Sequence, residues 1–172
     1  MLFMKYASFA VLSLSCLSCT EDDGPIGENP CSTFETTLAI SDSMSQPATT
    51  FNVGEDIVFS MKIKNTTNAP ATLTASSSCT AVVFEVIDAS KQRQWGSADG
   101  IACIQALQPR TYAPLESVTY ASTWKQKNTG NTQVPAGTYH VNADVGQSMT
   151  NIKGNEFLCR AELSKNKNFV IQ

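Results

Sequence analysis

Residues 51–65 read Phe-Asn-Val-Gly-Glu-Asp-Ile-Val-Phe-Ser-Met-Lys-Ile-Lys-Asn, and this stretch decides the fold. After a turn signal at Gly54, apolar and mostly polar residues alternate. The apolar set is Ile57, Phe59, Met61 and Ile63, and between them stand Val58, Ser60, Lys62 and Lys64. A period of two is typical of a strand with one buried face and one face in water. We therefore predict a central strand of an antiparallel β-sandwich over residues 56–64.

Other short extended stretches, separated by turn residues, fill the rest of the chain. The expected strands are 33–41, 71–75, 81–88, 92–96, 101–107, 117–124, 137–145 and 166–172. Residues 109–116 are expected to form a loop, and 149–163 remain open between a loop, a hairpin and a short helix. The pattern predicts an all-β fold, an immunoglobulin-like antiparallel β-sandwich of seven to nine strands.

Composition narrows the class of function. The chain has 172 residues, with 12 Lys and Arg against 15 Asp and Glu. This mildly acidic balance gives no electrostatic reason to bind nucleic acid. The length allows one domain and a short appendage.

The N-terminus reads as an export signal. Lys5 is followed by a short apolar run and then by Cys16-Leu-Ser-Cys19. This arrangement resembles a bacterial lipoprotein signal, in which a cysteine at the cleavage site becomes the lipidated N-terminus. Cys19 is the favoured lipidation residue because an acidic segment follows it, and Cys16 is the alternative. An ordinary secretory signal is the competing interpretation.

Three segments follow from this reading. Residues 1–18 are expected to be a lipoprotein signal peptide, 19–32 an acidic flexible tether, and 33–172 the β-sandwich. The tether holds Gly, Pro and acids and almost nothing to bury, which predicts a solvated spacer. The expected location is a bacterial cell envelope, lipid-anchored at the outer membrane or cell surface.

If Cys19 carries the lipid, four further cysteines remain in the mature chain, and an even number in an exported chain predicts disulfides. Cys79 and Cys103 stand almost symmetrically about an apparent turn at residues 89–92. Cys31 precedes the first strand, and Cys159 lies in the C-terminal region. We predict the pairs Cys79–Cys103 and Cys31–Cys159, each worth about 2–4 kcal/mol. The spacings and the single histidine do not suit a metal site.

Several motifs together resemble the intracellular proteinase inhibitor (BsuPI) family over residues 51–145. They are Phe51-x-Val-Gly-Glu with Asn65, Phe84-x-Val-x-Asp88 before Trp95, Tyr120-x-x-x-Trp124, and Pro135-Ala-Gly-Thr-Tyr139-x-Val-x-Ala143. The resemblance implies an immunoglobulin-like sandwich and inhibition of a proteinase. Two features depart from the family: Leu115 stands where Gly is frequent, and this chain carries an export signal and cysteines although the family's namesake is intracellular.

Catalytic patterns do not stand out. The one histidine, His140, is expected on the wet side of a strand, away from any nucleophile. The aromatics Trp95, Trp124 and Tyr139 occupy positions typical of a core, which favours a structural role over a sugar-binding platform. Tyr139 is also expected to donate a hydrogen bond across a corner of the fold. We predict no enzyme activity, no cofactor and no metal.

Two functions remain. The first is a lipid-anchored extracytoplasmic module that binds a protein partner. The second, implied by the family resemblance, is a proteinase inhibitor that acts through an exposed, rigid loop. The candidate inhibitory loop is 125–135, which offers Lys125 and Lys127 to a trypsin-like pocket. The loop at 65–71 is the alternative, and an ordinary solvated hairpin is the competing interpretation for both.

Overall fold

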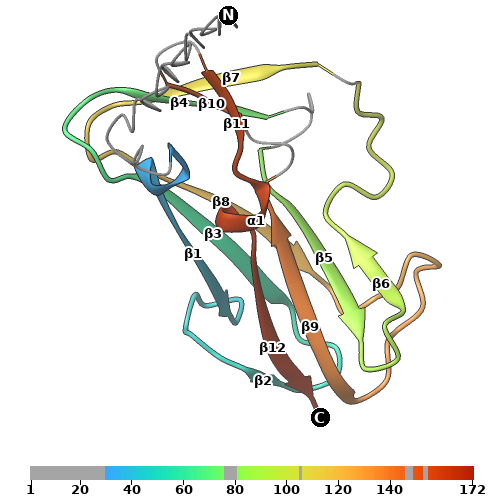
Figure 1. The fold of residues 1–172 in the computed structure, drawn as a ribbon. Coiled ribbons are helices and arrows are strands. Elements are labelled where there is room, and N and C mark those ends of the chain that lie inside the picture. The colour runs from blue at the N-terminus through green and yellow to red at the C-terminus, as the bar shows by residue number, and fades with distance from the viewer. Residues whose placement is uncertain (1–29, 76–80, 105, 146–148, 153–154) are drawn as a thin grey trace, which may run out of the picture.

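Two antiparallel sheets face each other and enclose the core, as Figure 1 shows. The computed structural model describes residues 30–75, 81–104, 106–145, 149–152 and 155–172. One sheet has three strands in the order β1-β3-β8: β1 (Phe34–Ser41), β3 (Ile57–Asn65) and β8 (Ser117–Trp124). The other has five in the order β2-β12-β9-β5-β6: β2 (Thr50–Phe51), β12 (Lys165–Ile171), β9 (Gly137–Asp144), β5 (Val83–Asp88) and β6 (Arg93–Gly96).

The fold is an immunoglobulin-like antiparallel β-sandwich, as predicted. Its two facing sheets hold three and five strands, which agrees with the expected seven to nine. Strand β2 is the exception to antiparallel order, because its two residues run parallel to β12.

A third sheet lies at the end of the molecule away from the C-terminus (Figure 1). Its order is β11-β10-β4-β7, with β11 (Asn155–Leu158), β10 (Met149–Ile152), β4 (Ala71–Ala75) and β7 (Gln108–Tyr112). The stretch left open at 149–163 is thus a hairpin, followed by the single turn α1 (Arg160–Leu163).

Strand β7 corrects the expectation of a loop over 109–116. Pro109 suggests a loop because it cannot donate a ladder hydrogen bond, but β7 ends its sheet, and an edge strand tolerates proline. Conversely, the predicted extended strand at 101–107 is wrong over its described residues, none of which belongs to a strand.

Strand β3 lies at the centre of its sheet, one residue later than predicted. It pairs with β1 on one side and with β8 on the other. Ile57, Phe59, Met61 and Ile63 are each 0% exposed. The apolar positions of the alternating pattern are therefore the residues that β3 buries in the core.

Aromatic rings fill the space between the sheets around Phe59. The centroid of its ring lies 6.2 Å from that of Phe84, 6.1 Å from that of Trp95, 6.4 Å from that of Trp124 and 5.7 Å from that of Phe169. Trp124 and Tyr139 are buried, and Trp95 packs half-buried against the cluster. Burying a large apolar side chain contributes about 1.5–3 kcal/mol, so this cluster is a main source of stability.

A disulfide joins the two ends of the domain. Cys31 lies in the 3₁₀ turn η1 (Pro30–Thr33), and its sulfur bonds that of Cys159, which precedes α1. Both cysteines are buried. The tether predicted through residue 32 therefore extends too far, because Cys31 is already part of the core.

The other cysteine predictions fall largely on residues without described structure. Cys103 is disulfide-bonded, whereas its predicted partner, Cys79, lies outside the described residues. Cys16 and Cys19, and with them the expected signal and lipidation site, lie outside them too. No helix in the described part of the chain is long and apolar enough to cross a membrane.

Candidate functional site

The segment of residues 125–136, here called the β8–β9 loop, connects the two sheets near the β6 end of the sandwich (Figure 1). It contains the predicted inhibitory residues Lys125 and Lys127, both of which are exposed. The contacts within and below the loop determine whether it holds one conformation.

Gln126 fixes the first part of the loop from beneath. Its side chain is 0% exposed, and its backbone has a positive φ of 54°. Its Nε2 donates to the Asn52 carbonyl at 2.8 Å, and its Oε1 accepts from the Gly54 amide at 2.8 Å. A buried amide with both ends satisfied ties the loop to the turn before β3.

The first side of the loop is also tied to the core and to its second side. The indole Nε1 of buried Trp124 donates to the Lys127 carbonyl at 2.8 Å. Lys127 and Gln133 form an isolated antiparallel bridge. The amide of Val134, a buried residue, donates to the Gln126 carbonyl at 2.9 Å.

The tip is organised by Asn128. Its Oδ1 accepts from the amides of Gly130 and Thr132, both at 3.0 Å. The neighbouring Thr129 amide donates to the Gln94 carbonyl at 2.9 Å, which fastens the tip to β6. An asparagine side chain that accepts from nearby backbone amides stabilises a tight turn.

Tyr139 closes the end of the loop. Its hydroxyl donates to the Pro135 carbonyl at 2.7 Å, which is the corner hydrogen bond expected from the sequence. Burial, with a smaller contribution from the charge of Asp88, raises the pKa of the Tyr139 hydroxyl. The hydroxyl therefore stays a hydrogen-bond donor at neutral pH.

The two lysines differ in their backbone surroundings. The Lys127 carbonyl is held by the Trp124 indole. The Lys125 carbonyl accepts no hydrogen bond from the described residues. Both side chains leave the loop toward solvent and can reach an acidic partner.

The alternative loop at 65–71 is also built around a buried amide. Asn65 is 0% exposed, and its Nδ2 donates to the carbonyls of Ala69 at 2.8 Å and Ala113 at 3.0 Å. Its Oδ1 accepts from the Thr67 amide at 3.0 Å. This loop is ordered, but it offers no cationic side chain.

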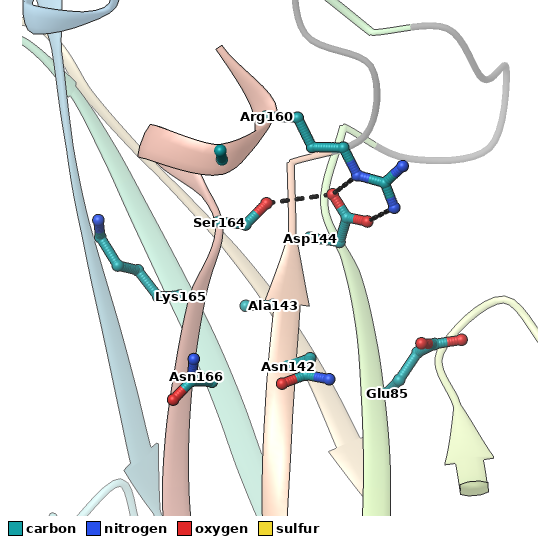
Figure 2. Close-up of a pocket in the computed structure, with 9 residues that line it drawn as sticks. Glu85, Asn142, Ala143, Asp144, Arg160, Ser164, Lys165 and Asn166 are labelled. Atoms are coloured by element: carbon teal, nitrogen blue, oxygen red, sulfur yellow. Dashed lines mark hydrogen bonds and ion pairs between the residues drawn. The ribbon is translucent and has the colours of Figure 1, made fainter.

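Sequence reasoning missed a polar depression on the outer face of the five-stranded sheet, shown in Figure 2. It has a volume of about 530 Å³. Arg160 forms an ion pair with Asp144, and Ser164 Oγ donates to Asp144 Oδ1 at 3.1 Å. The hydrogen bond from Arg160 to Asp144, and then the charge of that carboxylate, raise the pKa of Arg160. No sequence signal links Asp144 to Arg160, because the strand register and the turn α1 bring them together.

Charged and amide side chains line the depression. Asp144 is neutralised by Arg160, Lys165 also lines the depression, and Glu85, Asn142 and Asn166 stand in a row across three strands. His140 lies two residues before Asn142 on β9, where its cross-strand neighbours are Ile87 and Asn168. Within the described residues, no group of three or more His, Cys, Asp or Glu could hold a metal ion.

Solved structures resemble the chain only in general shape. A β-glucosidase from Listeria innocua in complex with glucose matches at 14% identity and a TM-score of 0.42, over 80% of this chain and 16% of that one. The C-terminal domain of wzt matches at 7% identity and 0.46, over 81% and 74%. A CARDB domain from Pyrococcus furiosus, in complex with di-metal ions, matches at 11% and 0.40, over 81% and 90%. The chain thus spans about 16% of the length of the glucosidase.

The comparison with protein families is more specific. No curated protein matches the chain. The family model described as intracellular proteinase inhibitor, BsuPI, matches residues 45–149, which include β3, both central aromatics Phe59 and Trp124, and the whole β8–β9 loop. This match covers more than half of the 172 residues. The chain therefore belongs to the BsuPI intracellular proteinase inhibitor family.

Proposed function

We propose that this protein is an exported, lipid-anchored and non-enzymatic domain that binds and inhibits a proteinase through the β8–β9 loop. Membership of an inhibitor family supports a proteinase as the partner. The lipoprotein-like start of the chain, with Cys19 as the lipidated residue, supports an envelope location. The observation that carries the proposal is the rigid loop with two exposed lysines.

Rigidity matters because binding a flexible loop costs free energy. Ordering one mobile side chain at an interface costs about 0.5–1.5 kcal/mol. In the β8–β9 loop, Gln126, Asn128 and Trp124 already hold the backbone in place through hydrogen bonds. A proteinase that binds this loop therefore meets a conformation that is already formed.

Lys125 is the better candidate for the specificity pocket of a trypsin-like proteinase. A substrate-like inhibitor places the carbonyl of its pocket residue in the oxyanion hole, so that carbonyl must be accessible. The Lys127 carbonyl already accepts a hydrogen bond from the Trp124 indole, whereas the Lys125 carbonyl accepts none from the described residues. Lys127 then contributes charge at the rim of the contact.

The test is inhibition of a panel of serine, cysteine and metallo-proteinases by the full chain and by three variants. We expect inhibition of trypsin-like enzymes, a loss of at least about tenfold in affinity for Lys125→Ala, and a smaller loss for Lys127→Ala. Lys167→Ala is the matched control, because Lys167 is an exposed lysine on β12. Absence of inhibition across the panel would refute the proposal, and an equal effect of all three variants would refute the role of the loop.

The anchor has its own test. Intact mass of the protein purified from its native membrane should show acylation at Cys19, and Cys19→Ser should release the protein into the soluble fraction. Retention of the lipid mass by the Cys19→Ser variant would move the site to Cys16. An unlipidated native protein would remove the envelope location from the proposal and leave the inhibitor assignment intact.

A further inference from the structure

Strand β8 forms an edge of the sandwich, and among the described residues only β3 pairs with it. It pairs with β3 along its full length, from Ser117 opposite Lys64 to Trp124 opposite Ile57, and lies at the end of the sheet order. On its other side, no strand or backbone hydrogen bond joins it within the described residues. Unpaired backbone groups on an edge form a template for pairing.

The other edges of the two facing sheets are protected. Strand β6 is four residues long, follows an irregular register with β5, and carries Arg93 in ion pairs. Strand β2 has two residues. Strand β1 carries exposed Glu35 and is bonded to the end of α1 through Thr36 Oγ1, which donates to the Leu163 carbonyl at 2.8 Å.

Strand β8 has none of these protections. It is eight residues long, Ser-Val-Thr-Tyr-Ala-Ser-Thr-Trp, with no charge, proline or glycine. Its register with β3 has no bulge. Natural monomeric sheets place charges, proline or bulges on such an edge to prevent pairing, so the edge of β8 is suited to accept a strand.

The hydrogen bonds to β3 determine which residues of β8 point their backbone amide and carbonyl away from β3, in the plane of the sheet. These residues are called outward below. The Glu116 carbonyl accepts from the Asn65 amide at 2.9 Å, so position 116 faces β3. Because backbone groups alternate along a strand, the outward amides and carbonyls belong to Ser117, Thr119, Ala121 and Thr123. An added antiparallel strand must match this set.

A second copy of β8 presents a matching set of outward amides and carbonyls. A twofold axis at Tyr120 places Ser117 opposite Thr123 of the second copy and Thr119 opposite its Ala121. All four outward residues of each strand then donate and accept ladder hydrogen bonds. The alternative axis at Ala121 leaves Ser117 opposite Lys125, beyond the strand.

The charges at the strand ends favour the same arrangement. Glu116 precedes β8 and Lys125 follows it. Glu116 already pairs with Arg110 at 3.3 Å, so the discrimination comes mainly from Lys125. Parallel pairing would bring the Lys125 side chains of the two copies together, whereas antiparallel pairing places them at opposite ends. Between these ends, no charged side chain of either β8 opposes another.

The inner side of this edge has space for the side chains of an added strand. A cleft of about 190 Å³ lies beside Tyr120, and Phe84 and Ile101 contribute to its wall. Ile101 is 56% exposed. The inward-facing side chains of a second β8, above all its Tyr120, would cover this apolar surface.

We propose that the protein forms a twofold-symmetric dimer in which two β8 strands pair antiparallel about Tyr120. The three-stranded sheets of the two copies then form one continuous sheet. The two β8–β9 loops lie at opposite ends of the paired strands, and Lys125 remains outside the pairing. This dimer forms through β8 whether or not the protein inhibits a proteinase.

The test is sedimentation equilibrium of the full chain carrying Cys16→Ser and Cys19→Ser, so that lipid cannot drive association. We expect a monomer–dimer equilibrium with a dissociation constant below about 100 μM. Ala121→Lys should raise the dissociation constant at least about tenfold, because it places a charge on the edge. Ala39→Lys is the matched control: Ala39 is an exposed alanine in the same cross-strand row, on β1. A monomeric parent chain, or equal effects of both lysines, would overturn the proposal.

Two further variants test the pairing itself. Ala121→Pro removes an outward amide without touching the β3 ladder, so it should give a folded monomer by circular dichroism and sedimentation. Tyr120→Cys places two cysteines directly across the twofold axis, and oxidation should link the copies covalently. A dimer that survives Ala121→Pro, or a Tyr120→Cys chain that does not cross-link, would contradict this register.

Discussion

At the scale of single residues, two buried amides, Gln126 and Asn65, determine how the loops at opposite ends of the sandwich are built. Each is 0% exposed and each satisfies backbone groups from a segment distant in sequence. A buried polar side chain with full hydrogen bonding specifies one conformation, because any other leaves polar groups unpaired. Polar residues inside the core therefore set the geometry of the surface.

Gln126→Ala should lower the free energy of unfolding by about 1–3 kcal/mol, because it leaves the Gly54 amide and the Asn52 carbonyl without their partner. Denaturant unfolding followed by fluorescence measures the change. Gln133→Ala is the control, since the Gln133 side chain is exposed and donates only one long hydrogen bond, to Gln126 Oε1 at 3.3 Å, while its backbone bridge to Lys127 survives the substitution. Equal stability of the two variants would show that Gln126 does not anchor the loop.

The buried hydroxyl of Tyr112 should make the free energy of unfolding fall at high pH. Burial, and then the hydrogen bond with Tyr120 at 3.1 Å, raise the pKa of its hydroxyl. The protonated folded form is fully stabilised below the pKa of an unfolded tyrosine, about 10, and stability is lost as pH rises from there toward the folded pKa. Tyr112→Phe should be less stable at pH 8 by about 0.5–1.5 kcal/mol, and this difference should shrink by pH 11. A difference that stays constant with pH would contradict the assignment.

At the scale of elements, the β8–β9 loop illustrates what a strand pattern does and does not predict. The alternation of β3, β8 and β9 in the sequence predicts those strands almost to the residue, and it locates the lysines of the loop on the surface. Its internal order was not predictable, because it depends on Gln126 meeting the turn at Asn52 and Gly54, far away in sequence. In the same way, β7 escaped prediction because its edge position, and not its sequence, makes Pro109 acceptable.

Asn128→Ala should weaken inhibition more than it weakens the fold. The variant removes the acceptor for the amides of Gly130 and Thr132, so the tip loses its preferred shape. Two exposed hydrogen bonds at about 0.5–1.5 kcal/mol each predict a rise in the inhibition constant of about fivefold to one hundredfold. Inhibition kinetics should place most of the change in the dissociation rate. Thr138→Ala, on the neighbouring exposed strand position, is the control. An unchanged constant would mean that the tip does not contact the proteinase.

At the scale of the whole molecule, the chain combines a family domain with N- and C-terminal segments that lie beyond the family match. The BsuPI family match covers six of the eight strands in the two facing sheets, together with the core aromatics Phe59, Phe84 and Trp124, but not β1 or β12. The family match ends at residue 149, before α1 and β12. Strand β12 nevertheless supplies Phe169 and Ile171 to the core, so the C-terminal region completes the sandwich.

The disulfide between Cys31 and Cys159 links this C-terminal region covalently to the start of the domain. The two residues are 128 positions apart, and they join the segment before β1 to the segment before β12. A cross-link over a loop of this length restricts the unfolded chain strongly, with a typical contribution of about 2–5 kcal/mol. Replacing both cysteines by alanine should lower the free energy of unfolding by that amount. The double variant leaves Cys103 in its own disulfide, which chemical reduction would not.

Hydrogen exchange distinguishes two ways in which that loss could arise. If the disulfide acts on the unfolded chain, exchange in all core strands should accelerate by a similar factor, because every core amide then reports global unfolding. If it instead clamps the C-terminal region onto the sandwich, amides of β12 and α1 should exchange much faster in the variant, while those of β3 change little. We expect the first pattern, because β12 is already paired with β9 along seven residues and contributes two buried side chains. Fast exchange confined to β12 and α1 would show that the pairing with β9 cannot hold the C-terminal region without the covalent bond.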